Sequence, residues 1–260
     1  MAPVSRLRVH VSLALTLMCV AALGCRARAQ TTVIVFAAAS LSEPFHALER
    51  AYEAEHPGVD VVLNLAGSQL LASQLVEGAP ADVFASADVA TLERVAAERS
   101  LEPGSRRAFA ANRLVVVVPA DADFDELEDL REPGLKVVLA GPEVPVGRYA
   151  RAALDQLGLS EAVEANLVSN EDSVNGVLAK LELGEADAGL AYATDLRRSP
   201  SLRGIELPAS VDVRARYELA VLADGPTPAQ GLAFAAFVTG AKGQAVLREH
   251  GFTAVGEGEG

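Results

Sequence analysis

An α/β fold built on a parallel, doubly wound sheet is predicted by three features of the 260-residue chain. Short apolar runs alternate with amphipathic segments along most of its length, which is the pattern of successive strand–helix units. The run at 113–119 is almost continuously apolar, as expected for a strand buried on both faces. Hydrophobic residues make up 50% of the chain, enough for a large core. In such sheets, ligands bind beyond the carboxyl ends of the strands.

The first part of the sheet is expected before residue 100. Strands are expected over 33–36, 59–65 and 82–85, and helices over 41–55, 70–76 and 89–98. The first helix has amphipathic spacing and ends at His56-Pro57-Gly58, because proline and glycine interrupt helices. Gly78 closes the second helix.

A second lobe is expected beyond the strand at 113–119. Its strands are expected over 137–140, 164–168 and 188–192, and its helices over 147–157 and 174–183. A strand over 215–222 then returns the chain to the first lobe, where helices over 228–238 and 242–250 pack. Two crossings predict two lobes around a central cleft, with residues 30–113 and 217–260 in lobe I and residues 114–216 in lobe II. The segment 257–260 is expected to be a disordered tail.

The N-terminal segment 1–29 has the pattern of an export signal. Arg6 and Arg8 precede an apolar run that is too short to span a bilayer, and Ala27-Arg28-Ala29 offers a small-residue cleavage site before Gln30. An alternative overlaps this one, because Ala-Leu-Gly-Cys at 22–25 is similar to a lipoprotein processing box and would place a lipid anchor on Cys25. Cleavage before Gln30 removes both cysteines, so the mature chain forms no disulfide.

The charge of the mature chain is strongly negative. Of the 22 lysine and arginine residues, four lie in the segment 1–29, which contains no Asp or Glu, so 18 basic residues face 35 acidic ones and the net charge is −17. This balance argues against a nucleic-acid or anionic-membrane surface. It does not exclude an anionic ligand, because salt screens the long-range field over about 8 Å whereas hydrogen bonds act at contact.

Two turns at strand ends carry the candidate site. Ala-Ala-Ala-Ser-Leu at 37–41 and Gly-Ser-Gln at 67–69 each place small residues and a hydroxyl where a helix begins, without Lys or Arg. Helix N-termini carry unpaired N–H groups and partial positive charge, so two of them aimed at one point suit a small oxyanion held by neutral donors. Ser40 has an equally good structural explanation, because Ser-Leu-Ser-Glu at 40–43 is a capping box. Ser68 lacks that signature, and a ligand contact is favoured there.

Four motifs carry a family resemblance that runs from about residue 33 to residue 255. They are Phe-Ala-Ala-Ala-Ser-Leu at 36–41, Gly-Ala-Pro-Ala-Asp-Val-Phe-Ala-Ser-Ala-Asp at 78–88, Pro-Val-Gly-Arg-Tyr-Ala at 145–150 and Leu-Ala-Tyr-Ala-Thr-Asp at 190–195. With these motifs the chain resembles the substrate-binding proteins of bacterial ABC importers for molybdate and tungstate. The resemblance implies a two-lobed type II periplasmic-binding-protein fold, a monomer outside the cytoplasm, and delivery of the oxyanion to a membrane permease and its ATPase.

The resemblance also implies five ligand-binding residues, namely Ser40 and Ser68 from lobe I and Val146, Val174 and Tyr192 from lobe II. The two valines can donate only through backbone N–H groups, and from the residues alone both are equally well explained as core residues at helix starts. Tyr192 at a strand end is, by the same reasoning, more often a half-buried core residue with a solvated hydroxyl.

Charged residues near these positions are expected to have structural roles. Arg148 is expected to be a solvated helix residue, whereas Asp82, Asp88 and Asp195 are expected to be caps or inter-lobe contacts, because carboxylates repel an anion. No cofactor and no metal cation is expected; molybdenum or tungsten would be bound as the oxyanion.

Other functional classes fit the sequence less well. A serine hydrolase would need a Gly-x-Ser-x-Gly elbow, which the chain lacks, and the histidines lie away from the strand ends. A metal-cation site would need clustered Cys, His or Tyr residues, but the four tyrosines are dispersed. The remaining competitor is a sulfate- or thiosulfate-binding protein on the same fold. The sequence therefore predicts a non-enzymatic solute-binding protein for molybdate or tungstate that closes by a hinge at 113–119 and 215–222.

Overall fold

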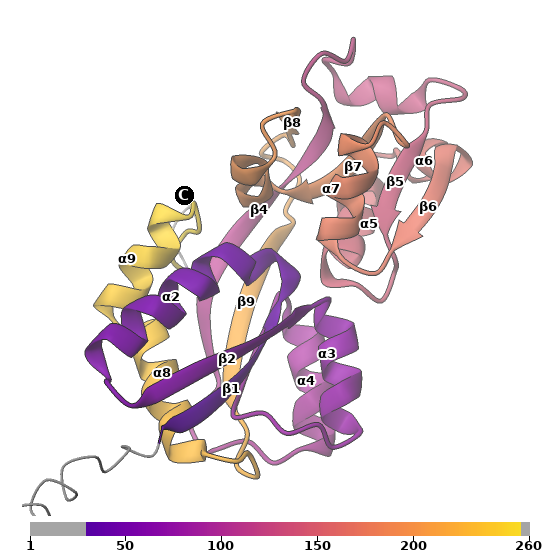
Figure 1. Ribbon diagram of the computed structural model, residues 1–260. Coiled ribbons are helices and arrows are strands. Elements are labelled where there is room, and N and C mark those ends of the chain that lie inside the picture. Colours follow the sequence, from indigo (N-terminus) through magenta and orange to yellow (C-terminus); the bar gives the residue numbers. More distant parts are fainter. Residues whose placement is uncertain (1–29, 256–260) are drawn as a thin grey trace, which may run out of the picture.

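A computed structural model describes residues 30–255, which form two lobes connected by two long strands (Figure 1). The connecting strands are β4 (Arg107–Pro119) and β9 (Arg214–Val221). The expected signal segment 1–29, with Cys25, and the expected tail 257–260 lie outside the described residues. Among the helices of residues 30–255, none combines the length and hydrophobicity that crossing a bilayer requires.

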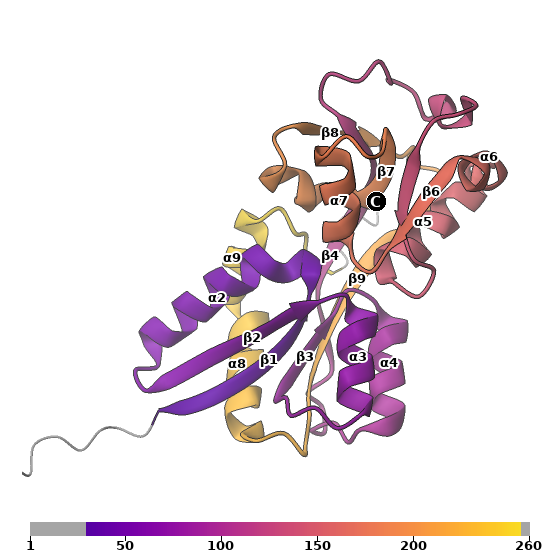
Figure 2. The ribbon, with the colours of Figure 1, turned by 45° about the vertical axis from the view of Figure 1, so that its right-hand side comes forward.

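Lobe I contains the N-terminal and C-terminal elements. Apart from the two connecting strands, its elements are β1 (Thr31–Ala38), the 3-10 helix η2 (Ala39–Leu41), α2 (Ser42–Glu55), β2 (Val59–Ala66), α3 (Ser68–Val76), β3 (Val83–Ser86), α4 (Val89–Glu98), α8 (Pro228–Thr239) and α9 (Ala241–Glu249). Helices α3 and α4 cover one face of its sheet, and α2, α8 and α9 cover the other (Figure 2). The core on the second face is aromatic, because Phe45 meets Phe109 and Phe234 edge-on at ring-centroid distances of 6.1 and 6.4 Å.

Lobe II consists of the middle of the chain. Its elements are η3 (Leu127–Arg131), β5 (Val137–Ala140), α5 (Pro145–Gln156), α6 (Ser160–Asn166), β6 (Leu167–Glu171), α7 (Val174–Glu182), β7 (Ala188–Tyr192), η4 (Ala193–Arg198) and β8 (Leu202–Glu206). Strand β5 is fully buried and pairs in parallel with both β6 and β7.

The strand order is β2-β1-β3-β9-β4-β7-β5-β6, and β8 also pairs with β4. Each lobe contains parallel pairs, whereas β9 is antiparallel to both of its neighbours. Strand β4 changes partners along its length, because residues up to Arg113 pair with β9 and residues from Leu114 pair with β7. The two-lobed α/β fold with two crossing strands is therefore confirmed.

The predicted strand over 164–168 is wrong in its first half. Glu164, Ala165 and Asn166 end helix α6, and the strand begins only at Leu167. The Ala- and Glu-rich sequence of α6 favours a helix, and burial of Val163 anchors it to the core. The buried Asn166 amide then donates to the carbonyls of Leu130 and Glu132, which fixes the turn into the strand.

Two further strand features were not predicted. Strand β4 begins at Arg107 rather than at 113. Its first half was not predicted because it mixes buried and exposed residues instead of forming an apolar run. Strand β8 is a short segment of mixed polarity that pairs only with β4. In both cases the strand is stabilised by pairing with a distant segment, which local patterns do not reveal.

Candidate functional site

One pocket between the lobes contains all five predicted site residues. Its cavity volume is about 10 Å³, far below the usual size of a site for a drug-sized ligand. The lining residues are Ala38, Ala39, Ser40, Gly67, Ser68, Ala87, Val144, Pro145, Val146, Ser173, Val174 and Tyr192. None of these side chains is charged. The pocket therefore suits a small ligand that is bound by neutral groups.

Three helices of at least nine residues begin at this pocket without a side-chain cap. The N-cap residues of α3, α5 and α7 are Gly67, Val144 and Ser173, and none of their side chains accepts a hydrogen bond from the helix that it precedes. By contrast, Asp88 caps the neighbouring helix α4 by accepting from the Thr91 N–H group at 3.0 Å. The first N–H groups of a helix have no intrahelical partner, so the three uncapped ends offer donors to an acceptor between the lobes.

Ser40 is not the cap of helix α2. The helix begins at Ser42, and its N-cap residue Leu41 makes no side-chain capping bond. The Ser40 hydroxyl instead lies 3.0 Å from the hydroxyl of Tyr217, a residue of strand β9. Of the two explanations for Ser40, the capping box is therefore wrong, and the side chain is left facing the pocket.

Ser68 is the first residue of helix α3 and is buried. Its Oγ accepts a hydrogen bond from the backbone N–H of Ala87 at 3.1 Å. Because an N–H group can only donate, the Ser68 proton is not used in this bond. The hydroxyl is therefore available as a donor on its pocket side.

Val146 and Val174 lie at the starts of α5 and α7, and both side chains are buried in the core. Their N–H groups belong to the first turn of each helix, so the core and donor explanations are compatible. Gly147 follows Val146 for a steric reason, because a Cβ atom there would lie 2.0 Å from the Gly141 carbonyl oxygen. Glycine at this position lets the start of α5 pack directly on the loop after β5.

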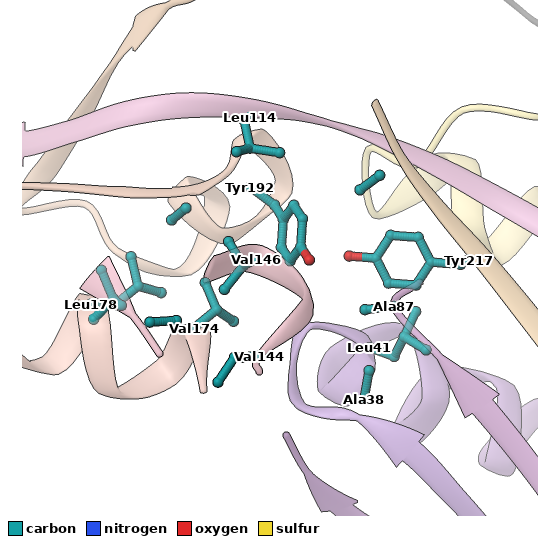
Figure 3. Packing of buried hydrophobic residues seen from close by; sticks show 14 of the residues in the cluster. Ala38, Leu41, Ala87, Leu114, Val144, Val146, Val174, Leu178, Tyr192 and Tyr217 are labelled. Atoms are coloured by element: carbon teal, nitrogen blue, oxygen red, sulfur yellow. The ribbon is translucent and has the colours of Figure 1, made fainter. Parts of the chain in front are cut away.

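Tyr192 ends strand β7 and is fully buried rather than half-buried, with an exposed fraction of 1%. Its side chain lies beside Val146 and Val174, and its hydroxyl points toward Tyr217 (Figure 3). That hydroxyl has no hydrogen-bond partner within residues 30–255. Burial raises the pKa of Tyr192 well above its usual value, so the group stays protonated. An unpartnered buried hydroxyl costs free energy, which a ligand acceptor in the pocket would recover.

Arg148 is not a solvated helix residue. Its Nε donates to Asp88 Oδ2 at 2.9 Å, and its Nη2 donates to the same oxygen and to the Thr91 hydroxyl. Arg148 belongs to α5 of lobe II, whereas Asp88 and Thr91 belong to lobe I. The charge is therefore neutralised in an ion pair that connects the lobes, and Asp88 is both a cap and an inter-lobe contact, as predicted.

A second inter-lobe contact lies at Gly67. A Cβ atom on Gly67 would lie 2.3 Å from the backbone oxygen of Asp172 in lobe II. The Gln69 side chain donates to that same oxygen at 2.7 Å. The backbone at Gly67 therefore closely approaches the opposite lobe.

Asp195 accepts a hydrogen bond from the backbone of Tyr192, a pocket-lining residue. Its carboxylate accepts from the Tyr192 N–H at 3.1 Å and from Arg198 at 3.0 Å. Burial raises the pKa of Asp195 to about 6, although Arg198 and the Tyr192 N–H group oppose the increase. Asp82 is likewise structural, because it accepts from the N–H group of Ile34 and the hydroxyl of Thr227.

The raised pKa of Asp195 predicts a pH dependence of stability. Between about pH 4 and pH 6 the folded chain binds more protons at this residue than the unfolded chain, so its free energy of unfolding falls as pH rises. We expect Asp195→Asn, which keeps an acceptor for the Tyr192 N–H, to remove about 3 kcal/mol of this pH dependence. Urea unfolding of both proteins from pH 4 to pH 7 measures the difference. Parallel pH profiles would contradict the burial of a titrating carboxylate.

Comparisons with known proteins agree with this fold and pocket. The chain matches the family described as bacterial extracellular solute-binding protein over residues 33–253. The molybdate-binding protein ModA of Mycobacterium tuberculosis is 40% identical over 224 residues, which cover 85% of this chain and 84% of the relative. ModA of Escherichia coli is 33% identical over 230 residues, covering 85% and 88%.

Solved structures show the same architecture. The periplasmic molybdate-binding protein of Azotobacter vinelandii superposes with a TM-score of 0.75 at 22% identity, covering 85% of this chain and 98% of that one. A sulfate-binding protein of Mycobacterium tuberculosis superposes with a TM-score of 0.73 at 18% identity, covering 87% and 88%. Fold and pocket thus define a periplasmic-binding-protein architecture with a small site between two lobes. The chain belongs to the family of bacterial extracellular solute-binding proteins.

Proposed function

We propose that the protein captures molybdate in the pocket between its lobes and delivers it to the permease and ATPase of an ABC importer. The pocket carries this proposal, because uncapped helix ends and hydroxyl groups surround it without any charged side chain. The molybdate-binding relatives at 40% and 33% identity support the choice of ligand. Tungstate has the same shape and charge, and we propose that it binds at the same site.

Five groups are proposed as ligand donors. They are the hydroxyls of Ser40, Ser68 and Tyr192 and the backbone N–H groups of Val146 and Val174. Hydrogen bonds to a charged group contribute about 1.5–3 kcal/mol each, so this set supports a binding free energy of about −10 kcal/mol after desolvation and closure are offset.

Selectivity against phosphate follows from the neutral donors. With their protons pointing at the ligand, they suit a fully deprotonated tetrahedral anion and leave the proton of hydrogen phosphate facing another donor. Sulfate has the charge and shape of molybdate, so cavity size must separate the two. We also propose that the protein does no chemistry on its ligand, because the pocket-lining residues include no His, Cys, Asp, Glu or Lys.

Closure of the two lobes is proposed to create the complete donor set. We place the lobe boundaries at 113/114 and 216/217, and the change of partners of β4 between Arg113 and Leu114 supports the first of these. The Arg148–Asp88 ion pair and the Gln69–Asp172 hydrogen bond join the lobes on either side of the pocket. Both contacts would break when the lobes separate.

The proposed function includes export and a monomeric state. Residues 1–29 are proposed to direct export, with cleavage before Gln30 or, alternatively, lipid attachment at Cys25. Family membership supports a location outside the cytoplasm.

Calorimetric titration of the chain starting at Gln30 tests the proposal. Molybdate and tungstate are expected to bind one-to-one with a dissociation constant of about 50 nM or below, and sulfate and phosphate at least about a hundredfold more weakly. Tight sulfate binding would instead identify a sulfate-type receptor on the same fold. Absence of binding with all four anions would reject an oxyanion site.

A further inference from the structure

Tyr217 lies behind Ser40, outside the set of residues that line the pocket. Its side chain is completely buried, and its ring contacts Tyr192 and Phe252 at centroid distances of 5.9 and 5.3 Å. Figure 3 shows its hydroxyl facing that of Tyr192. The hydroxyl is 3.0 Å from Ser40 Oγ. Tyr217 therefore contacts two pocket-lining residues, Ser40 through its hydroxyl and Tyr192 through its ring.

The direction of the Tyr217–Ser40 hydrogen bond follows from the burial of the phenol. Within residues 30–255, Ser40 Oγ is the hydrogen-bond partner of the Tyr217 hydroxyl. A buried tyrosine O–H group that donates to no acceptor costs free energy. Ser40 lines the pocket, so its own proton can be donated to a ligand there. The phenol is therefore the donor, and Ser40 Oγ accepts.

A serine that accepts such a bond keeps its own proton for the pocket. Ser68 shows the same arrangement, because the Ala87 N–H group occupies its oxygen from behind. Ser40 and Ser68 thus differ in the source of that bond, which is a backbone amide for Ser68 and a tyrosine for Ser40. We propose that Tyr217 is a positioning residue that holds the Ser40 hydroxyl as a donor toward the bound oxyanion; this inference rests on the proposed function.

The arrangement has a consequence for specificity. A serine hydroxyl that rotates freely can donate or accept, and it can then accept the proton of hydrogen phosphate. The bond from Tyr217 occupies one of the two acceptor positions of Ser40 Oγ and favours the orientation in which the Ser40 proton points into the pocket. Tyr217 belongs to β9, one of the two strands that connect the lobes.

A double-mutant cycle tests the inference. Molybdate affinity is measured by calorimetry for the parent chain, Tyr217→Phe, Ser40→Ala and the double variant. Loss of the phenol hydroxyl is expected to weaken binding about tenfold when Ser40 is present. It is expected to weaken binding less than about twofold in the Ser40→Ala background, because the effect passes through that hydroxyl. Equal losses in both backgrounds would mean that Tyr217 has only a structural role, and would overturn the inference.

Tyr52→Phe is the matched control. Tyr52 is also fully buried in lobe I, and its hydroxyl has no partner within residues 30–255. Its replacement is expected to leave molybdate affinity unchanged. If thermal melting shows that Tyr217→Phe does not fold, Tyr217→Met replaces it in the same cycle, because a methionine also fills buried space without a hydroxyl. The expected loss again requires Ser40; the same loss without Ser40 would overturn the inference.

The proposed function and the positioning role of Tyr217 can be rejected separately. A parent chain that binds no molybdate would reject the proposed function, and the role of Tyr217 with it. A parent chain that binds molybdate while the cycle is additive would reject only the positioning role.

Discussion

The double variant Ser40→Ala, Ser68→Ala is expected to bind molybdate about a thousandfold more weakly than the parent chain. Each hydroxyl donates one hydrogen bond to a doubly charged anion, and bonds of this kind contribute about 1.5–3 kcal/mol each. Losing both removes about 3–6 kcal/mol of binding free energy, which corresponds to a factor of roughly a hundred to ten thousand in the dissociation constant. Calorimetric titration, with competition against a weaker anion for the parent, measures the change.

The matched control for the serine pair is Ser42→Ala combined with Ser201→Ala. Neither residue lines the pocket, and Ser201 is exposed. The control is expected to retain parental affinity, and thermal unfolding should show that both double variants fold. Unchanged affinity in the pocket variant would remove Ser40 and Ser68 from the proposed site.

Gly67→Ala is expected to weaken molybdate binding about a hundredfold while leaving each lobe folded. Gly67 has a φ of −56° and a ψ of 135°, which alanine adopts without strain, so the substitution is penalised only by space. The added methyl group would lie 2.3 Å from the Asp172 oxygen of the opposite lobe. Overpacking of this kind costs about 1–3 kcal/mol, and separation of the lobes is the way to relieve it.

Two measurements isolate this effect on closure. Calorimetry gives the loss of affinity, and small-angle scattering with saturating molybdate should show the parent chain compact and the variant more open. Gly141→Ala is the control, because its Cβ would meet its nearest neighbours at ordinary distances of 3.7 and 3.8 Å. A Gly67→Ala protein that closes and binds like the parent would show that the approach of Asp172 is not needed for binding.

The layout of the sheet and the location of the pocket were accessible from the sequence for a physical reason. Parallel strands bring their carboxyl ends to one edge, so the turns at Ser40 and Ser68 were expected to meet. Only the family resemblance predicted Val146 and Val174 at the same pocket. A backbone N–H group is present in almost every residue, so the identity of the side chain does not reveal its role. The function of all five residues as ligand donors stays a prediction.

What the sequence could not predict depends on pairing over long distances. Arg148 and Asp88 are 60 positions apart, and nothing in the local pattern around either residue identifies the other. The Ser40–Tyr217 bond spans 177 positions, so a capping box was the better local explanation for Ser40. The wrong strand prediction at 164–166 has the opposite origin. There the local sequence favours a helix, whereas the strand was expected from the alternation of strands and helices along the chain.

The position of β9 between β3 and β4 also determines when the chain can fold. The sheet of lobe I needs residues 214–221 before β3 and the first half of β4 can be joined, although those two strands end by residue 119. A nascent chain that stops short of residue 214 would therefore expose two unpaired strand edges, and its contacts of largest sequence separation would form last. We expect lobe I to complete its sheet late, after nearly all of the chain has been synthesised.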